Sequence, residues 1–96
     1  MTGNGVLSLR WEADGLLQYE VLIQFVRDRN ERAAEALALR IDDGVEQVCL
    51  FPQSGRPGKV EGTRELIVHP NYIVVYRTTD TAVEILRLLH ARRRYP

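Results

Sequence analysis

The apolar residues of the first half of the chain change from a two-residue spacing to a helical one. Residues 5–12, GVLSLRWE, place Leu7, Leu9 and Trp11 on one side, and this alternation predicts a β-strand. From about Ala13 to Arg29 the spacing becomes helical. Two apolar stripes follow this predicted helix: Leu16, Tyr19, Ile23 and Val26 on one, and Leu17, Val21 and Phe25 on the other. Two stripes indicate that the helix contacts both a sheet and another helix.

A second helix is predicted from Asn30 to about Leu50. The Asn30 side chain can accept hydrogen bonds from the first free backbone amides and so cap the helix. Apolar residues then recur at steps of three and four: Ala34, Leu37, Ile41, Val45 and Val48. Pro52 cannot continue a helix, which sets the end near Leu50. The short turn between the helices predicts an antiparallel helical hairpin.

The second half of the chain is rich in β-branched and aromatic residues. TRELIVH (63–69), YIVVYRT (72–78) and AVEILRLLH (82–90) predict three strands, with PN and TDT as hairpin turns. A basic, glycine-rich connector, SGRPGKVEGTREL (54–66), joins the second helix to these strands. The predicted order is β-α-α-β-β-β, an α+β fold in a single domain of residues 1–96.

The last predicted strand is apolar on both of its faces. Val83, Ile85 and Leu89 alternate with Leu86 and Leu88. The helical hairpin can cover only one face of the sheet, so the other would expose apolar side chains and arginines unless something binds it. We therefore expect a protein partner on that face, with the C-terminal tail or a second copy of the chain as the alternative cover.

Composition bounds the class of protein. The chain has 96 residues, of which 45% are hydrophobic and 27% charged, as in an ordinary globular domain. No apolar run approaches the roughly 18 residues of a membrane span, and the N-terminus has no targeting pattern. These features predict a cytoplasmic location without membrane contact. Cys49 is the sole cysteine, and its place in an apolar helical pattern predicts a packing role.

The net charge of zero conceals an asymmetry between the halves. Residues 1–48 hold five arginines against nine acids, whereas residues 49–96 hold seven arginines and one lysine against four acids. A basic half can attract nucleic acid or an acidic partner, although a solvated basic rim explains the same charges.

Candidate chemistry is confined to this basic half. The sequence has no metal-ligand cluster and no phosphate-binding glycine motif, so we expect neither a metal nor a cofactor. A basic and aromatic set remains: Arg56, Lys59, Arg64, Arg77, Arg87, His90, Arg92, Arg93, Arg94 and Tyr95. Its arginines could hold a phosphate backbone, and His90 could transfer protons near neutral pH. Taken alone, a residue of this set is more often a surface charge or a hydrogen-bonded histidine at the end of a strand.

Three phrases of the sequence carry a family resemblance. FPQSGRPGKVEGTRELIV, YIVVYR and VEILRLLHARR resemble the RelE/ParE toxin superfamily of bacterial type II toxin–antitoxin modules, which includes plasmid stabilisation systems. The resemblance implies an antiparallel sheet of strand order 1-4-3-2 with the helical hairpin on one face. It also implies growth arrest unless a cognate antitoxin covers the toxin, with operator DNA bound only through that antitoxin.

Two targets divide this superfamily. In the RelE-like branch, a metal-independent endoribonuclease cleaves mRNA on the ribosome, and the resemblance then assigns catalysis to Arg64, His90, Arg93 and Tyr95. In the ParE-like branch, the toxin poisons DNA gyrase without a hydrolytic site. The remaining cations would then contact the target or the antitoxin: Arg56, Lys59, Arg77, Arg87, Arg92 and Arg94.

The ParE-like reading is favoured by three features. Ile73 stands where the RNase branch has an arginine, EILRLLH resembles the ParE-like form, and the distal tyrosine of one RNase type would fall beyond Pro96. A degenerate toxin that acts only as an antitoxin-binding module is the third possibility, and Ile73 is the argument for it.

Overall fold

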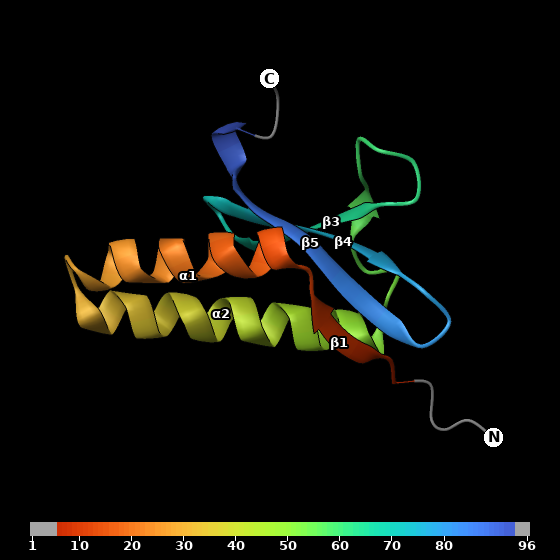
Figure 1. Ribbon diagram of the computed structural model, residues 1–96, viewed down its shortest axis with the longest axis horizontal. Coiled ribbons are helices and arrows are strands. Elements are labelled where there is room, and N and C mark those ends of the chain that lie inside the picture. Colours follow the sequence, from red (N-terminus) through yellow and green to blue (C-terminus); the bar gives the residue numbers. More distant parts are fainter. Residues whose placement is uncertain (1–5, 94–96) are drawn as a thin grey trace.

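A computed structural model describes residues 6–93, without the side chain of Arg93. The elements are β1 (Ser8–Trp11), α1 (Ala13–Arg27), α2 (Glu31–Leu50), β2 (Arg56–Pro57), β3 (Arg64–His69), β4 (Tyr72–Thr78), β5 (Ala82–His90) and a short 3₁₀ turn, Ala91–Arg93. They form one five-stranded sheet of order β1-β5-β4-β3-β2, with the helical hairpin against one face (Figure 1). The expected α+β fold and the order of the four expected strands are confirmed, and β2 is an addition at the edge.

The sheet is not wholly antiparallel as expected, because β1 pairs with β5 in parallel, from Ser8 opposite Ala82 to Trp11 opposite Ile85. The hairpin explains this direction. It returns the chain to the start of β1, where the Leu7 amide donates to the Cys49 carbonyl at 3.1 Å. Two hairpin turns then connect β3 to β4 and β4 to β5, each pair antiparallel. As a result, β5 runs in the same direction as β1.

The hydrophobic core lies between the helical hairpin and the sheet. The Asn30 side chain caps α2 as predicted, accepting from the Ala33 amide at 3.0 Å. Every apolar residue of the predicted α2 stripe is buried, and Ile23 of α1 joins them. On the sheet side, the core is completed by Val68, Val74, Tyr76, Val83, Ile85 and Leu88. No helix within residues 6–93 is long and apolar enough to cross a membrane.

The second stripe of α1 does not pack as predicted. Leu17, Val21 and Phe25 are 58%, 60% and 54% exposed, because the single neighbouring helix and the sheet together cover only the other side of α1. The stripe is therefore a surface feature.

A β-bulge corrects the predicted alternation of β5. Val75 of β4 lies opposite Arg87, whereas its neighbour Tyr76 lies opposite Ile85, so Leu86 is an extra residue in β5. Beyond the bulge the side chains change faces. Leu88 consequently points into the core, although the strict alternation had placed it on the opposite side from Val83 and Ile85.

The glycine-rich connector is held to the sheet by one buried hydroxyl. The Tyr76 hydroxyl accepts from the Gly55 amide and donates to the Pro52 carbonyl, both at 2.9 Å, and Tyr76 is completely buried. A side chain at Gly55 would place its Cβ 2.6 Å from that hydroxyl oxygen, so only glycine fits without a rearrangement. The predicted tight turning of the connector is seen at Gly62, whose φ is +87°.

We predict that Tyr76→Phe lowers the free energy of unfolding by about 1–3 kcal/mol, because the buried Gly55 amide loses its acceptor. Urea unfolding followed by circular dichroism measures the change. Tyr72→Phe, on the same strand, is the matched control and should change the midpoint little. Equal effects of the two variants would contradict the anchoring role of Tyr76.

Candidate functional site

The face of the sheet that the helices leave uncovered carries a network of ion pairs at one end. Glu84 of β5 is 9% exposed and accepts from Arg77 Nε at 2.7 Å. Arg10 of β1 lies 3.7 Å from the other oxygen of the same carboxylate. The hydrogen bond between Arg77 and Glu84 raises the pKa of Arg77, and the negative charge of Glu84 raises it further. Two cations of the basic face are thus neutralised within the chain.

A second buried acid, Glu65 of β3, neutralises part of the connector. It is 5% exposed, and Arg56 of β2 lies 3.3 Å from its carboxylate. Glu65 is opposite Val75, which is opposite Arg87, so these three side chains cross the uncovered face in one row. The acid holds the connector over the sheet as well as balancing its charge.

An apolar row follows at the other end of the same face. Ile67 of β3 pairs with Ile73 of β4, which pairs with Leu89 of β5. Ile67 is 56% exposed and Ile73 only 2%. The position at which the RNase branch is expected to carry an arginine is therefore occupied by a buried aliphatic side chain in an apolar row.

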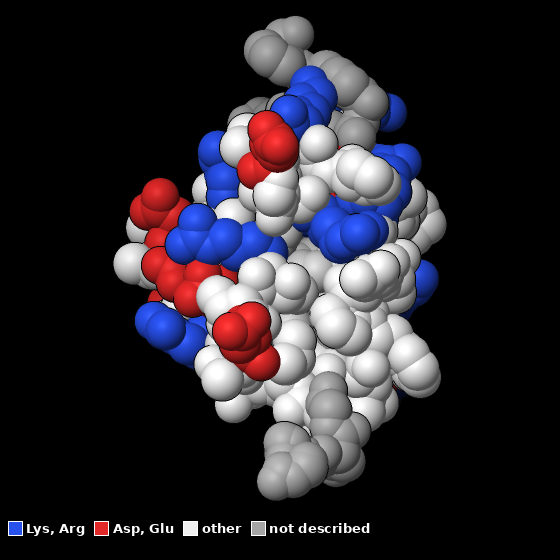
Figure 2. All heavy atoms as spheres, turned by 90° about the vertical axis from the view of Figure 1, so that its right-hand side faces the viewer, with Lys and Arg blue, Asp and Glu red and all other residues white. Residues whose placement is uncertain are grey.

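A hollow of about 400 Å³ lies between this face and the connector. Its floor is formed by Val75, Leu86 and Leu89, and the connector residues 59–63 form one wall. Lys59, Arg77 and Arg87 line it, so several of the proposed contact residues are brought together. Figure 2 shows Lys and Arg side chains gathered over the upper part of the end of the molecule that carries the connector, above a broad area without charge.

Of the residues proposed for RNA cleavage, the structure describes the side chains of Arg64 and His90, and these two are not brought together. Arg64 is opposite Tyr76, hence on the helix side of the sheet, and its guanidinium donates to the Gly55 carbonyl at 2.7 Å. His90 is opposite Tyr72 at the far end of the sheet. Four residues along β4 and two strand spacings separate their backbones by roughly 16 Å. Arg94 and Tyr95 lie outside the described residues, as does the side chain of Arg93.

Sequence reasoning overlooked an aromatic cluster around Tyr72. Its ring centroid lies 5.4 Å from the rings of both His69 and His90. Each histidine accepts a hydrogen bond at Nδ1 from the amide two residues ahead, Asn71 at 3.0 Å and Arg92 at 3.1 Å. The sequence could have indicated this cluster, because both histidines stand at the end of a predicted strand, next to a turn. Within residues 6–93, no three His, Cys, Asp or Glu side chains form a metal site.

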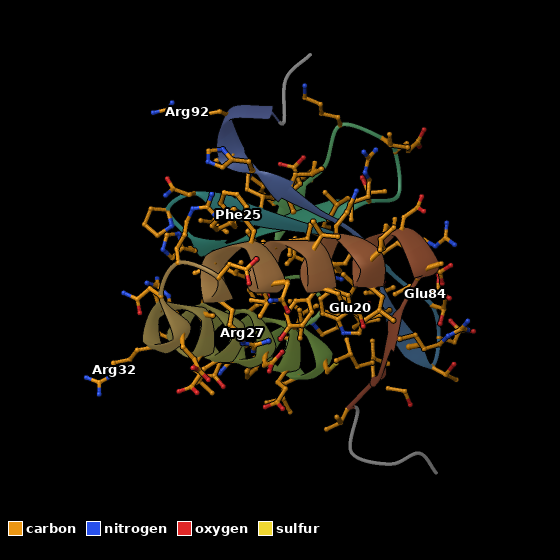
Figure 3. The ribbon with its side chains drawn as sticks, turned by 60° about the vertical axis from the view of Figure 1, so that its left-hand side comes forward. Glu20, Phe25, Arg27, Arg32, Glu84 and Arg92 are labelled. Carbon is orange, nitrogen blue, oxygen red and sulfur yellow. The ribbon has the colours of Figure 1, made fainter. Side chains whose placement is uncertain are left out.

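A larger groove lies between α1 and the C-terminal half of β5. It has a volume of about 780 Å³. The exposed stripe of α1 forms one wall, and Tyr72, Leu88, Leu89 and His90 form the other with Arg87 between them. Figure 3 shows Phe25 on the side of α1 that faces the end of the sheet, with Arg92 beyond it. The predicted apolar surface therefore continues from the sheet onto a helix.

Comparison with known proteins identifies the family. A family model described as the ParE toxin of the type II toxin–antitoxin system, parDE, matches residues 9–95. The chain belongs to this toxin family. The match spans nearly the whole fold, from β1 through the end of β5.

Individual relatives agree with this family. The Y4kP protein of Sinorhizobium fredii is 33% identical over 89 residues, which cover 92% of each chain. Toxin RelE2 of Caulobacter vibrioides is 29% identical over 83 residues, 86% of this chain and 93% of its own. Among solved structures, the chromosomal ParDE system of P. aeruginosa matches with a TM-score of 0.77 at 19% identity, covering 91% of this chain and 98% of that one. The YoeB dimer of Staphylococcus aureus matches with a TM-score of 0.64 at 10% identity, covering 88% and 97%.

One electrostatic property of the aromatic cluster is directly testable. Burial, and then the positive charge of Arg40, lower the pKa of His69 below 6.5. The folded protein thus holds His69 neutral at a pH where the unfolded chain already binds a proton. Acidification through pH 6.5 should therefore reduce stability through this residue.

We predict that the His69 ring titrates below pH 6.5 in a nuclear magnetic resonance titration. Arg40→Ala should move the midpoint upward, toward the value of a free histidine, since it removes a nearby positive charge. A midpoint at or above 6.5, or one that Arg40→Ala leaves unchanged, would contradict this assignment.

Proposed function

We propose that this toxin arrests growth by binding DNA gyrase through its surface, and that a cognate antitoxin neutralises it. The observation that supports this most is that several of the basic residues already have partners within the chain. Arg56 and Arg77 are paired with buried acids of the same chain, and Arg64 donates to the Gly55 carbonyl. The charges of Arg56 and Arg77 are thus balanced by acids of the same chain, and the Arg64 guanidinium is held by a backbone carbonyl.

Cleavage of RNA makes different demands on a site. It requires cations that stabilise the phosphate and a group that transfers a proton, acting together on one phosphodiester. Arg64 and His90 lie at opposite ends of the sheet, and Ile73 contributes an aliphatic group to the uncovered face. Binding to a protein surface needs only shape, apolar area and a few charges, and the hollow and the groove supply these.

A RelE-like endoribonuclease is the second candidate. It is favoured by the RelE name of the Caulobacter relative and by His90, which lies beside Tyr72 and is followed by the basic residues 92–94. A degenerate toxin that only binds its antitoxin is the third. Operator DNA would in each case be bound through the antitoxin.

We predict that expression of the chain alone arrests bacterial growth and that co-expression of the small antitoxin encoded beside it restores growth. The measurement is colony formation after induction, with the soluble protein quantified in parallel. Normal growth at a high level of folded protein would favour the degenerate module.

We further predict that the purified toxin inhibits supercoiling by gyrase and leaves mRNA intact in a translation extract. Loss of inhibition should be graded: single substitutions such as Arg64→Ala and His90→Ala should weaken it by about tenfold or less, because no single side chain does chemistry. Truncation after Leu89 should be severe. Cleavage of mRNA that His90→Ala abolishes, with antitoxin binding retained, would instead establish the RelE-like candidate.

A further inference from the structure

Two turns at one end of the sheet are closed by histidines in the same way. The Nδ1 atom of His69, the last residue of β3, accepts a hydrogen bond from the Asn71 amide at 3.0 Å. The Nδ1 atom of His90, the last residue of β5, accepts from the Arg92 amide at 3.1 Å. In both turns the acceptor serves the amide two residues ahead. This is the hydrogen bond of an Asx turn, which the side-chain oxygen of Asn or Asp normally makes.

Asn71 joins the two turns into one chain of hydrogen bonds. Its amide donates to His69, and its carbonyl accepts from the Ala91 amide at 2.7 Å. Ala91 begins the 3₁₀ turn after β5, and the next residue, Arg92, donates to His90. The start of the 3₁₀ turn is therefore held by the turn between β3 and β4 as well as by its own strand.

The Tyr72 ring connects the two histidines. Tyr72 pairs with His69 of β3 on one side and with His90 of β5 on the other. Its ring centroid lies 5.4 Å from that of each imidazole, with interplanar angles of 45° to His69 and 80° to His90. Packing against one shared ring restricts the rotation of both imidazoles, so that each Nδ1 stays directed at its own turn.

Only an unprotonated Nδ1 can accept these hydrogen bonds. A neutral imidazole accepts at one nitrogen, whereas a protonated imidazole donates at both. His69 faces Tyr72 of β4 and the positive charge of Arg40 on α2, and burial and then this charge lower its pKa. His90 faces Tyr72 and lines the groove with uncharged residues of α1 and with Arg87 of its own strand. The surroundings of His69 therefore favour the neutral ring that its turn requires.

We propose that His69 and His90 are positioning residues, whose unprotonated Nδ1 atoms hold the C-terminal 3₁₀ turn, and with it Arg92, in the orientation that contacts the target. The part that concerns the target rests on the proposed function, in which Arg92 is an expected contact residue. Figure 3 shows Arg92 at the end of the molecule, beyond the end of β5. Protonation of either histidine places a donor opposite a backbone donor, so acid releases the turn.

Asparagine and glutamine distinguish the two nitrogens of an imidazole. The side-chain oxygen of Asn takes the position of Nδ1 and keeps the hydrogen bond to the amide two residues ahead, whereas the oxygen of Gln lies one bond further out. His90→Asn and His90→Gln both remove the ring that packs on Tyr72. A difference between the two variants therefore reports the acceptor at Nδ1 and not the packing.

The first measurement is hydrogen exchange of the Arg92 amide in the full chain by nuclear magnetic resonance, corrected for the intrinsic rate of each sequence. We expect about tenfold less protection in His90→Gln than in the unchanged toxin, and protection within about twofold of the unchanged toxin in His90→Asn. Acidification gives a second readout. The Asn71 amide of the unchanged toxin should lose protection as His69 is protonated, whereas in His69→Asn it should stay protected.

The second measurement is inhibition of gyrase supercoiling by the same variants. His90→Gln should inhibit several-fold less, up to about tenfold, and His90→Asn should inhibit as the unchanged toxin does. His69→Asn and His69→Gln provide a further pair if a variant of His90 fails to fold, which thermal unfolding shows.

Equal protection of the Arg92 amide in His90→Asn and His90→Gln would overturn this inference and leave the proposed function standing. Equal loss of activity in both variants would also overturn it, because the ring of His90 would then be required in itself. If the unchanged toxin does not inhibit gyrase, the proposed function and the role of Arg92 at the target are both wrong. Exchange of the Arg92 amide then still decides whether the histidines hold the turn.

Discussion

The contact between α1 and the edge of β5 shapes the groove and the exposed apolar stripe of this toxin. A helix can lie this close to a strand only where no side chain intervenes, and Gly15 provides that place beside Ile85. Gln18 then satisfies the Leu88 amide, which an edge strand would otherwise leave open for pairing. Because the helix takes the place of a longer β1, one stripe of α1 faces solvent and the groove forms beside it. Substitution of Gly15 would therefore disturb both the fold and the groove.

The two buried acids of the sheet, Glu65 and Glu84, organise the charges of the uncovered face. Glu65 and Glu84 each lie on the uncovered face and neutralise arginines of the connector and of neighbouring strands. A buried carboxylate is stable only with such partners. The arrangement gives Arg56 and Arg77 of the basic half acid partners within the fold. Arg87 stands apart from this network and is exposed beside apolar side chains.

Much of the fold could be predicted from the sequence, and the limits have physical reasons. The spacing of Ala34, Leu37 and Ile41, the Asn30 cap and the three β-rich runs located the hairpin and the sheet. The parallel pairing of β1 depends on where the hairpin returns the chain, which local spacing does not encode. The bulge at Leu86 also escaped prediction, because an unbroken apolar run such as EILRLLH reads equally well in either phase. The second stripe of α1 was recognised, but whether a stripe is buried depends on how many elements surround the helix.

The candidate site was predicted by residue type rather than by location. The basic residues could be collected from the sequence, but Glu65 and Glu84, which pair with some of them, were missed, since strand register decides which charges meet. The most direct test of the contact between α1 and β5 is hydrogen exchange at the Leu88 amide, measured by nuclear magnetic resonance in the unchanged toxin and in Gln18→Ala. We predict about tenfold faster exchange in the variant, because the Leu88 amide loses its acceptor, while the Gly55 amide, which donates to the Tyr76 hydroxyl, exchanges as before. Exchange at Leu88 that Gln18→Ala leaves unchanged would contradict the role of α1 in closing this edge of the sheet.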